Sequence, residues 1–283
     1  MQPVVAVIAP GMMGSAVAGR LTSSGLEVRT LLAGRSAATV ARAAAAGMRD
    51  ASMEQIAAAD FILSIVPPGE ALALAEQLAP ALRAAPRRTI FVDCNAVSPE
   101  TVRRIDAVVR ETGAAFVDGG IIGPPPEPDS SKTRIYLSGS DAGKVAGLSA
   151  FGLSMPVQPG PVGAASAMKM SYAGITKGFT ALGAAMMLAA TRAGTDDALI
   201  AEMSVSQPAL LKWLISQMPK MHGKAYRWVA EMEEIAAFIG ADRPGAGFYE
   251  AAARLYEAIA ADFEGPCVET AALDGFCEKA KSV

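Results

Sequence analysis

The sequence predicts an α/β domain with a mostly parallel sheet over residues 1–160, followed by an all-helical domain over residues 161–283. Two observations predict this fold class. Through the first half of the chain, short apolar runs rich in β-branched residues alternate with helical patterns, which is typical of crossover units between parallel strands. After about residue 160 these runs stop, and long helical patterns follow.

The first half contains candidate strands, each a short apolar run, over 4–9, 27–32, 61–68, 88–95, 114–123 and 133–140. Helical patterns lie between them, over 14–25, 37–47, 70–82 and 98–113. Gly25 suits the C-terminal cap of the first helix. Ser98 suits an N-cap, with Pro99 in the first turn and Gly113 at the end of that helix.

The helical half begins with a segment, 163–192, in which bulky side chains recur at spacings of three and four residues. These side chains lie on one stripe of a helix and are Met168, Tyr172, Ile175, Phe179, Leu182 and Met186. Gly174, Gly178 and Gly183 interrupt the pattern, and because glycine weakens a helix, they indicate a close approach of another group to the backbone. Further helices are expected near 196–220, 224–239 and 247–262.

Composition excludes several classes of protein. The 283 residues are 52% hydrophobic with a net charge of −3, so no basic field is available to neutralise nucleic-acid phosphates. Cys94, Cys267 and Cys277 are odd in number and far apart, which favours reduced thiols in a cytoplasmic protein. We interpret the single histidine, His222, as a loop or surface residue, and with one histidine and no CxxC motif we expect no zinc site.

Neither a secretory signal nor a membrane span is predicted. The first apolar run lacks a basic leader and contains Pro10, Gly11 and Gly14, which suit a strand and a turn. The most membrane-like stretch is 178–191, with 14 residues. Because about 20 residues are needed to span a bilayer, we expect a buried helix there.

A dinucleotide-binding turn is predicted at the N-terminus, where the first strand is followed by A-P-G-M-M-G and a helix. In the G-x-G-x-x-G pattern the first glycine allows a tight turn, the second lets the backbone approach the pyrophosphate, and the third lets the helix pack closely. Gly11 and Gly14 take the second and third roles, and Ala9 can take the first if its φ is negative. Backbone N–H groups of Met12, Met13 and Gly14 would face the phosphates. The alternative is a strand–turn–helix whose glycines serve only the turn.

The segment after the second strand favours NADP(H) over NAD(H). NAD enzymes usually place a carboxylate there, about 20 residues past the loop, to hold the ribose 2′-hydroxyl. This chain reads LLAGRS instead, without a carboxylate. Arg35 and Ser36 can hold a 2′-phosphate through charge-assisted hydrogen bonds. The alternative is that Arg35 is a solvent-exposed loop residue.

With these motifs the sequence resembles the β-hydroxyacid dehydrogenase family, which includes 3-hydroxyisobutyrate dehydrogenase and, more distantly, 6-phosphogluconate dehydrogenase. The resemblance covers nearly the whole chain and is carried by VIAPGMMGSAVAGRL, GRS, SIVPP, VDCNAVSP, FVDGGIIGP and GAASAMKMSYAGITKG. The segment RWVAEMEEIAA is similar to a phosphogluconate-dehydrogenase-like branch. The resemblance implies a Rossmann domain, a long connecting helix, and an all-helical C-terminal domain that builds a homodimer.

The resemblance also implies a catalytic lysine on the connecting helix, and the matching residue is Lys169 in SAMKMSY. When a hydride moves between an alcohol carbon and nicotinamide, a side chain within hydrogen-bond reach must carry the proton of the oxygen. The ordinary pKa of lysine, about 10.4, is high for this task, and burial beside the cofactor would lower it. The alternative is a surface lysine on an amphipathic helix.

Two sites depart from the family pattern. Ala173 stands where the family has an asparagine, four residues after the lysine, so we expect Tyr172 or Lys177 to take over part of its role.

The second departure is the segment Ile122-Gly123-Pro124, which stands where the family has a Ser-Gly-Gly loop that grips the substrate carboxylate. The serine hydroxyl is lost, and so is one backbone donor, because proline has no N–H. A substrate that is larger or less polar than the standard small 3-hydroxyacids therefore fits better.

Three smaller expectations concern the edge of the sheet and the helical domain. Asn95 follows a parallel strand at the end where ligands bind, so its amide either contacts the nicotinamide or substrate or forms a turn. Val66 and Pro67 are expected to pass beside the cofactor's ribose. Arg227 and Glu231 lie four residues apart on one helical face, which favours an ion pair within that helix over a cap on the active site.

The sequence thus predicts a cytoplasmic, NADP(H)-dependent oxidoreductase that acts on a hydroxyacid or a related alcohol/carbonyl pair, with Lys169 as general acid/base. Two alternatives stay open. One is an imine reductase of the same fold, although imine reductases generally have aspartate or tyrosine in place of the lysine. The other is an NADP(H)-binding sensor without turnover.

Overall fold

The computed structural model describes residues 2–127 and 132–282. It divides into two compact units, Met1–Met170 and Ser171–Val283. The dividing line falls within one helix, α7, which spans Ala164–Ala193.

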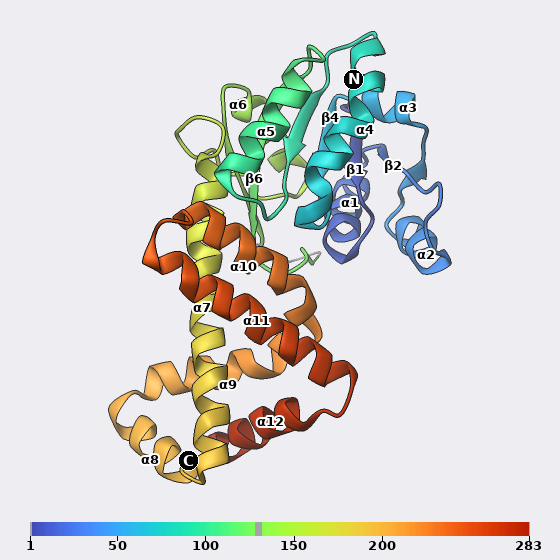
Figure 1. Cartoon of the computed structure of the whole chain (residues 1–283). Helices are drawn as coiled ribbons and strands as arrows, with labels where there is room; N and C mark the ends of the chain where they lie inside the picture. The colour runs from blue at the N-terminus through green and yellow to red at the C-terminus, as the bar shows by residue number, and fades with distance from the viewer. Residues whose placement is uncertain (1, 128–131, 283) are drawn as a thin grey trace. The chain divides into compact units, whose positions relative to one another are not determined.

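The first unit is built on a seven-stranded sheet in the order β3-β2-β1-β4-β5-β6-β7. Figure 1 labels β1, β2, β4 and β6 of this sheet. The strands are β1 (Val5–Ile8), β2 (Val28–Thr30), β3 (Arg49–Asp50), β4 (Phe61–Ser64), β5 (Ile90–Asp93), β6 (Ala115–Ile122) and β7 (Arg134–Ser138). Neighbouring strands are parallel, apart from the antiparallel pair β6 and β7. The mostly parallel sheet is therefore confirmed. Strand β3 was not predicted, because two residues carry no periodicity.

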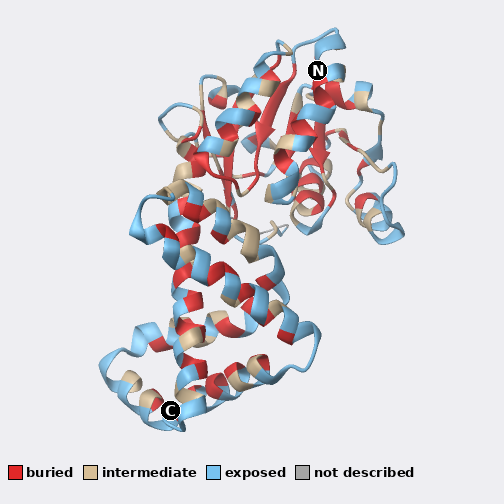
Figure 2. Ribbon diagram, viewed as in Figure 1, coloured by how far each residue is buried: buried red, intermediate tan, exposed pale blue. Residues whose placement is uncertain are grey.

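Helices cover both faces of this sheet. They are α1 (Met12–Ser23), α2 (Ala37–Ala45), α3 (Met53–Ala57), η1 (Pro68–Glu70), α4 (Ala71–Ala84), α5 (Pro99–Arg110), α6 (Ala142–Ala146) and η2 (Gly147–Phe151). Side chains of Val5 and Val7 pack in a core with α1, α2 and α6, and those of Ala6 and Ile8 in a core with α3, α4 and α5. Strands buried on both sides need apolar residues at every position, which explains the continuous apolar runs and the red strands of Figure 2.

The second unit is helical in its described part. After α7 it contains α8 (Asp196–Ser206), α9 (Pro208–Met221), η3 (His222–Lys224), α10 (Ala225–Ile239), α11 (Pro244–Glu264) and α12 (Val268–Lys281). The helix expected near 196–220 is two helices, because the residue before Pro208 is disfavoured in helical geometry. Helix α12 was not predicted.

The glycines of α7 mark where other helices of the second unit approach it. A Cβ on Gly183 would lie 2.4 Å from the Leu214 Cδ2 atom on α9, and one on Gly174 would lie 3.1 Å from the Tyr249 hydroxyl on α11. Gly178 faces the same tyrosine at 3.4 Å. The predicted close approach to the backbone is confirmed.

Helix α7 buries one side over 178–191, including Ala184, Met187 and Leu188, which agrees with the expected buried helix, whereas its bulky stripe is exposed. The side chains of this stripe are 48–60% exposed and belong to Tyr172, Ile175, Phe179, Leu182 and Met186. The segment is part of a 30-residue helix with a mean hydropathy of 1.3 over its most apolar window, long and apolar enough to cross a membrane, although half of that window is buried in the protein. Core helices of soluble proteins meet the same criterion.

His222 is also corrected, since the residue is buried rather than on the surface. It is 6% exposed, its Nε2 atom lies 3.0 Å from the Asp274 Oδ1 atom, and its ring stacks on Phe263 at 6.0 Å between centroids. The histidine ring thus packs as part of the core between η3, α11 and α12.

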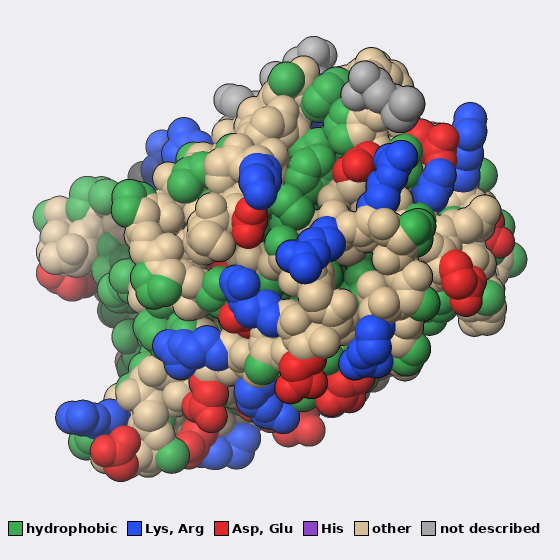
Figure 3. All heavy atoms as spheres, turned by 90° about the horizontal axis from the view of Figure 1, so that it is seen from above, with side chains coloured by type: hydrophobic (Ala, Val, Ile, Leu, Met, Phe, Trp, Pro, Cys, Tyr) green, Lys and Arg blue, Asp and Glu red, His purple; other side chains and the backbone are tan. Residues whose placement is uncertain are grey.

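Charged side chains of both signs are interspersed over the face that Figure 3 displays, where Lys and Arg alternate with Asp and Glu. This pattern agrees with the small net charge of −3.

Candidate nucleotide and proton-transfer site

The turn Ala9–Gly14, between β1 and α1, has the shape of a phosphate cradle. A Cβ on Gly14 would lie 2.0 Å from the Ala9 carbonyl oxygen, so the helix packs on the turn with no room for a side chain. A Cβ on Gly11 would meet no atom within 4 Å. Among the described non-glycine residues, Cys267 alone has a positive φ, so Ala9 meets its condition. The open space beside Gly11 lies where the G-x-G-x-x-G pattern places a pyrophosphate, so the turn fits that group.

The N-terminus of α1 offers hydrogen-bond donors to an anion. Gly11 provides no side-chain cap, and the first turn contains no acidic residue. Met12 is 67% exposed, and Met13 and Gly14 follow it in the first turn. The first N–H groups of a helix have no intrahelical acceptor and carry partial positive charge, so this end of α1 matches a phosphate.

Arg35 and Ser36 lie in the exposed connection between β2 and α2. Ser36 is the N-cap of α2, where its Oγ accepts a hydrogen bond from the Thr39 amide at 3.3 Å. Arg42, which was not among the predicted site residues, donates from α2 to the Pro10 carbonyl at 3.2 Å. The guanidinium group of Arg42 therefore lies beside the phosphate cradle. The available signal was a second arginine seven residues after Arg35, on the predicted helix 37–47.

The Asn95 amide is engaged within the protein. Its Oδ1 atom accepts from the Val66 amide at 2.7 Å, and its Nδ2 atom donates to the Ser64 hydroxyl at 2.9 Å and to the Asp93 carboxylate. The side chain thus holds the backbone that leads from β4 to Pro67. These bonds reach Ser64 and Val66, far earlier in the chain, rather than forming a local turn, and the contact of Asn95 with nicotinamide or substrate stays a prediction.

Four neighbouring strands each contribute one polar side chain to a buried row, which we call the polar row. Its members are fully buried neighbours in the register of β4 to β7: Ser64, Asp93, Asp118 and Ser138. Their place in the sequence does not distinguish them, because a polar residue near the end of an apolar run also suits a turn.

Lys169 lies on α7 against the carboxyl end of β6. Its half-buried ammonium group donates to the Ile121 carbonyl oxygen at 2.6 Å. Gly120 permits this packing, since a Cβ there would lie 2.9 Å from the Ala165 carbonyl oxygen and 3.1 Å from the Lys169 Cβ. Because β1, β4, β5 and β6 run parallel, the lysine lies at the same edge of the sheet as the phosphate cradle.

The segment after β6 begins with Ile122, the last residue of the strand, and Gly123. Gly123 has a φ of 123°, and a Cβ there would lie 2.5 Å from the Lys132 carbonyl oxygen. Pro124 follows, and its carbonyl accepts a hydrogen bond from the Thr133 hydroxyl. The backbone conformation therefore requires glycine, and the next residue has no N–H to offer.

Tyr172 and Lys177 belong to the second unit. Tyr172 is 51% exposed. The side chain of Lys177 is 15% exposed, forms an ion pair with Glu231 of α10, and places Nζ 5.3 Å from the centre of the Trp228 ring. Burial lowers the pKa of Lys177, and the neighbouring Glu231 carboxylate opposes this shift. Glu231 thus has an interhelical partner that its spacing from Arg227 did not predict.

Residues 4–145, half of the chain, match the NAD binding domain of 6-phosphogluconate dehydrogenase, and residues 190–259 match a domain of unknown function. An uncharacterized 28.5 kDa protein of Methanothermus fervidus is 30% identical over 177 residues, 62% of this chain. The chain spans 66% of that relative's length, just under two thirds.

Solved structures share the fold over nearly the whole chain. A conserved protein of unknown function, described as structurally similar to 3-hydroxyacid dehydrogenases, is 30% identical, with a TM-score of 0.70 over 92% of this chain and 98% of that one. The 3-hydroxyisobutyrate dehydrogenase of Mycobacterium tuberculosis, solved with L-serine, is 19% identical, with a TM-score of 0.69 over 100% and 99%.

Two further structures share the fold at lower identity. Psf3 in complex with NADP+ and 2-OPP is 18% identical, with a TM-score of 0.67 over 92% of this chain and 99% of that one. A reductive aminase of Aspergillus terreus in complex with NADPH4 is 20% identical, with a TM-score of 0.57 over 98% and 100%. With its parallel sheet, its phosphate cradle and the match over half of its length, this chain belongs to the β-hydroxyacid dehydrogenase family of NAD(P)-dependent dehydrogenases.

Proposed function

We propose that the protein is an NADP(H)-dependent oxidoreductase that transfers a hydride between nicotinamide and a hydroxyacid or related alcohol/carbonyl substrate, with Lys169 as general acid/base. The position of one amine carries this proposal. The Lys169 Nζ atom is held 2.6 Å from the Ile121 carbonyl, at the edge of the sheet that also bears the phosphate cradle. Ligands of open α/β sheets bind outside the carboxyl ends of the strands.

A bound nicotinamide would supply or accept the hydride, and a residue of the chain transfers the proton. In the direction of reduction, the Lys169 ammonium group donates a proton to the carbonyl oxygen of the substrate, and in oxidation the neutral amine accepts it. The hydrogen bond to Ile121 uses one of the three donors of the ammonium group and orients it.

Arg35 and Ser36 support the choice of NADP(H). Their connection is exposed, the stretch LLAGRS contains no carboxylate, and the N-terminus of α2 begins there. A guanidinium group beside a helix N-terminus suits a 2′-phosphate. Two neighbours that share the fold were solved with NADP+ or NADPH4.

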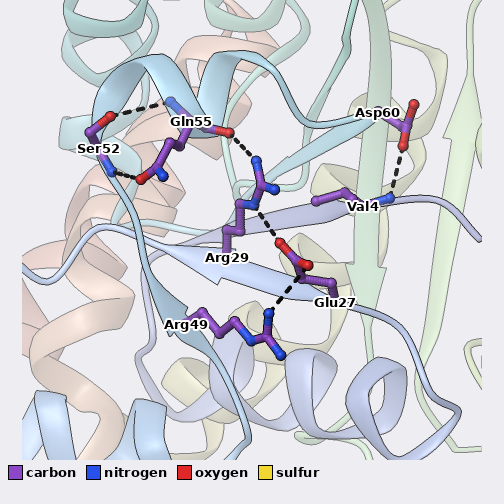
Figure 4. A network of polar contacts seen from close by, with 7 residues as sticks. All are labelled: Val4, Glu27, Arg29, Arg49, Ser52, Gln55 and Asp60. Atoms are coloured by element: carbon purple, nitrogen blue, oxygen red, sulfur yellow. Dashed lines mark hydrogen bonds and ion pairs between the residues drawn. The ribbon is translucent and has the colours of Figure 1, made fainter.

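The Arg35→Ala variant tests this choice by fluorescence titration with NADPH and NADH. We expect the variant to weaken NADPH binding far more than NADH binding, because only NADPH carries the 2′-phosphate. Arg49→Ala is the matched control, since this exposed arginine pairs with Glu27 at 3.4 Å (Figure 4) and is expected to leave both affinities unchanged. Equal weakening of both cofactors by Arg35→Ala contradicts the choice.

The segment after β6 supports a substrate that is larger or less polar than the small 3-hydroxyacids. Ile122 supplies an apolar side chain, Gly123 has no side chain, and Pro124 has no N–H. Charge-assisted hydrogen bonds are the usual means of holding a carboxylate, and this segment offers fewer donors than a Ser-Gly-Gly loop.

A screen for NADPH oxidation and NADP+ reduction across hydroxyacids, aldehydes, ketones and cyclic imines tests the activity. Turnover with a hydroxyacid or an alcohol/carbonyl pair is expected. Turnover confined to cyclic imines would identify an imine reductase instead. Intact cofactor binding without turnover on any of these substrates would identify a sensor.

We further propose that the protein is cytoplasmic and forms a homodimer through the exposed stripe of α7. Apolar side chains at alternating spacings of three and four form the kind of seam that two helices bury against each other, and contiguous exposed apolar surface marks an interaction site. Ile175→Glu with Leu182→Glu is expected to give a monomer by sedimentation. The control is Val205→Glu on α8, at a residue that is 82% exposed. An unchanged mass for the double variant contradicts dimerisation through this stripe of α7.

A further inference from the structure

Helix α7 has an N-terminus that its own residues cannot cap. The residue before Ala164 is Gly163, which has no side chain and has a φ of 99°. The first four N–H groups of a helix lack intrahelical acceptors, and an N-cap side chain from Ser, Thr, Asp or Asn usually accepts from one of them. The acceptors for α7 must therefore come from elsewhere in the chain.

Two members of the polar row supply them. Asp118 on β6 accepts through Oδ2 from the amides of Gly163 at 2.9 Å and Ser166 at 3.1 Å, and through Oδ1 from the Ser166 hydroxyl at 2.6 Å. Ser138 on β7 accepts from the Ala165 amide at 3.0 Å and donates to the Asp118 carboxylate at 2.9 Å. Asp118 and Ser138 are fully buried. A carboxylate also suits the positive end of the helix dipole.

We call the bonds from Asp118 and Ser138 the remote cap, and they hold the first turn of α7 against β6 and β7. Four donors converge on the Asp118 carboxylate of β6: the amide of Gly163 just before the helix, the amide of Ser166 in its first turn, and the hydroxyl groups of Ser138 and Ser166. Gly120 removes the side chain that would separate the strand from the helix, since its Cβ would overlap the Ala165 carbonyl. The helix can therefore neither slide along β6 nor rotate without breaking these bonds.

Lys169 lies one turn beyond the cap. It follows Ser166 by three residues, so both side chains share the face that packs on β6. Ile121 follows Asp118 by three residues along β6, which is about 10 Å, whereas three helical residues rise about 4.5 Å. The lysine side chain spans the difference and ends at the Ile121 carbonyl.

We propose that Asp118 is a positioning residue for proton transfer: with Ser138 it fixes the first turn of α7 against β6 and so sets where the Lys169 ammonium group lies. The inference rests on the proposed function, in which Lys169 carries the proton. Asp118 is fully buried and acts through Lys169. A misplacement of about 1 Å is enough to cost on the order of 100-fold in rate, so the register of α7 matters for the chemistry.

The test compares Asp118→Asn, Ser138→Ala and Ser166→Ala in the full chain. Asp118→Asn keeps the shape of the side chain, but replaces one carboxylate oxygen with an NH₂ group that faces the N–H and O–H donors of the cap. Each serine variant removes one hydroxyl group from the cap. The matched control is Ser52→Ala, which removes the capping box of α3 in the same unit (Figure 4). If Asp118→Asn does not fold, the two serine variants decide.

The readout is competitive acetylation with trace acetic anhydride, with the modification of Lys169 measured by mass spectrometry against exposed Lys212. We expect the ratio of Lys169 to Lys212 modification to change by about threefold or more, equivalent to half a pKa unit, in the cap variants but not in Ser52→Ala. An unchanged ratio in all cap variants, with lowered thermal stability, would show that Asp118 only holds the fold.

The labelling needs no substrate, so it separates this inference from the proposed function. A changed ratio in a protein that shows no turnover in the substrate screen supports the role of Asp118 in placing Lys169 and refutes the dehydrogenase. Where turnover is found, the cap variants are expected to lower kcat by about tenfold or more, a loss that follows from misplacement of the proton donor, with little change in KM. A changed KM at constant kcat contradicts the positioning role.

Discussion

The glycines at the start of α1 give a graded test of the phosphate cradle. Gly14→Ala would place a methyl group 2.0 Å from the Ala9 carbonyl oxygen, whereas an ordinary contact begins at 3.4 Å. The helix must therefore shift by about 1.4 Å against a backbone atom that cannot rotate away. Overpacking that moves backbone costs about 1–3 kcal/mol, and we expect a loss at the upper end of this range together with loss of NADPH binding.

Gly11→Ala adds the same methyl group where nothing lies within 4 Å, at a φ of −69° that alanine adopts freely. The free energy of unfolding of this variant is expected to lie within about 1 kcal/mol of that of the parent protein, because the only loss is that alanine is a poorer N-cap than glycine. The methyl group would nevertheless stand in the space for the pyrophosphate. We expect NADPH to bind at least about tenfold more weakly, a loss of about 1.4 kcal/mol.

Gly19→Ala completes the series. It lies inside α1 with nothing within 4 Å of the added methyl group, so it is expected to raise stability by about 0.5–1 kcal/mol and to leave affinity unchanged. Urea unfolding and NADPH fluorescence titration measure both quantities for all three variants. Normal NADPH affinity in Gly11→Ala, or normal stability in Gly14→Ala, would refute the cradle.

Four other predictions concern residues beside the site and in the helical unit. Asn95→Ala leaves the Val66 amide without its acceptor and is expected to lower stability by about 1–3 kcal/mol and to weaken NADPH binding; unchanged affinity in titration contradicts its bracing role. Lys177→Met removes the ammonium group that pairs with the partly buried Glu231 carboxylate and should cost about 3 kcal/mol in urea unfolding, whereas adding Glu231→Leu to this variant should recover part of the loss; no recovery contradicts the coupling. Iodoacetamide at pH 8 should modify exposed Cys267 and spare Cys94 and Cys277, because burial raises the pKa of both, that of Cys277 to about 11. Above pH 9 the folded chain keeps the thiol protons of Cys94 and Cys277, whereas the unfolded chain loses them. The free energy of unfolding should therefore fall as pH rises from 9 to 11. Equal urea midpoints at pH 8 and pH 10 would contradict this prediction.

The features that the sequence predicted well are those with local, repeated signals. The alternation of apolar runs with helical patterns predicted the parallel sheet, and the two glycines of the β1–α1 turn predicted the cradle at the correct residues. Three of the missed elements, β3, α3 and α6, have two to five residues, too few for a period to appear. Helix α12, which was also missed, has 14 residues, so shortness does not explain that miss. The exposure of the bulky stripe of α7 could not be predicted, because periodicity reports which side chains share a face and not whether that face is covered.

The polar network could not be predicted from local pattern. Asp118 caps a helix that begins about 45 residues later, and such a pairing depends on how β6 and α7 meet in space. Lys177 and Glu231 are separated by 54 residues. His222 offered no neighbouring signal for burial, since its partners Phe263 and Asp274 come from two later helices.

The most direct test of the account is the turnover number of Lys169→Ala, measured on the best substrate from the screen beside its dissociation constant for NADPH. Loss of a general acid/base lowers kcat by about 10²- to 10⁴-fold, while the phosphate cradle is untouched, so NADPH affinity should stay near that of the parent protein. Undiminished turnover in this variant would contradict the assignment of proton transfer to Lys169.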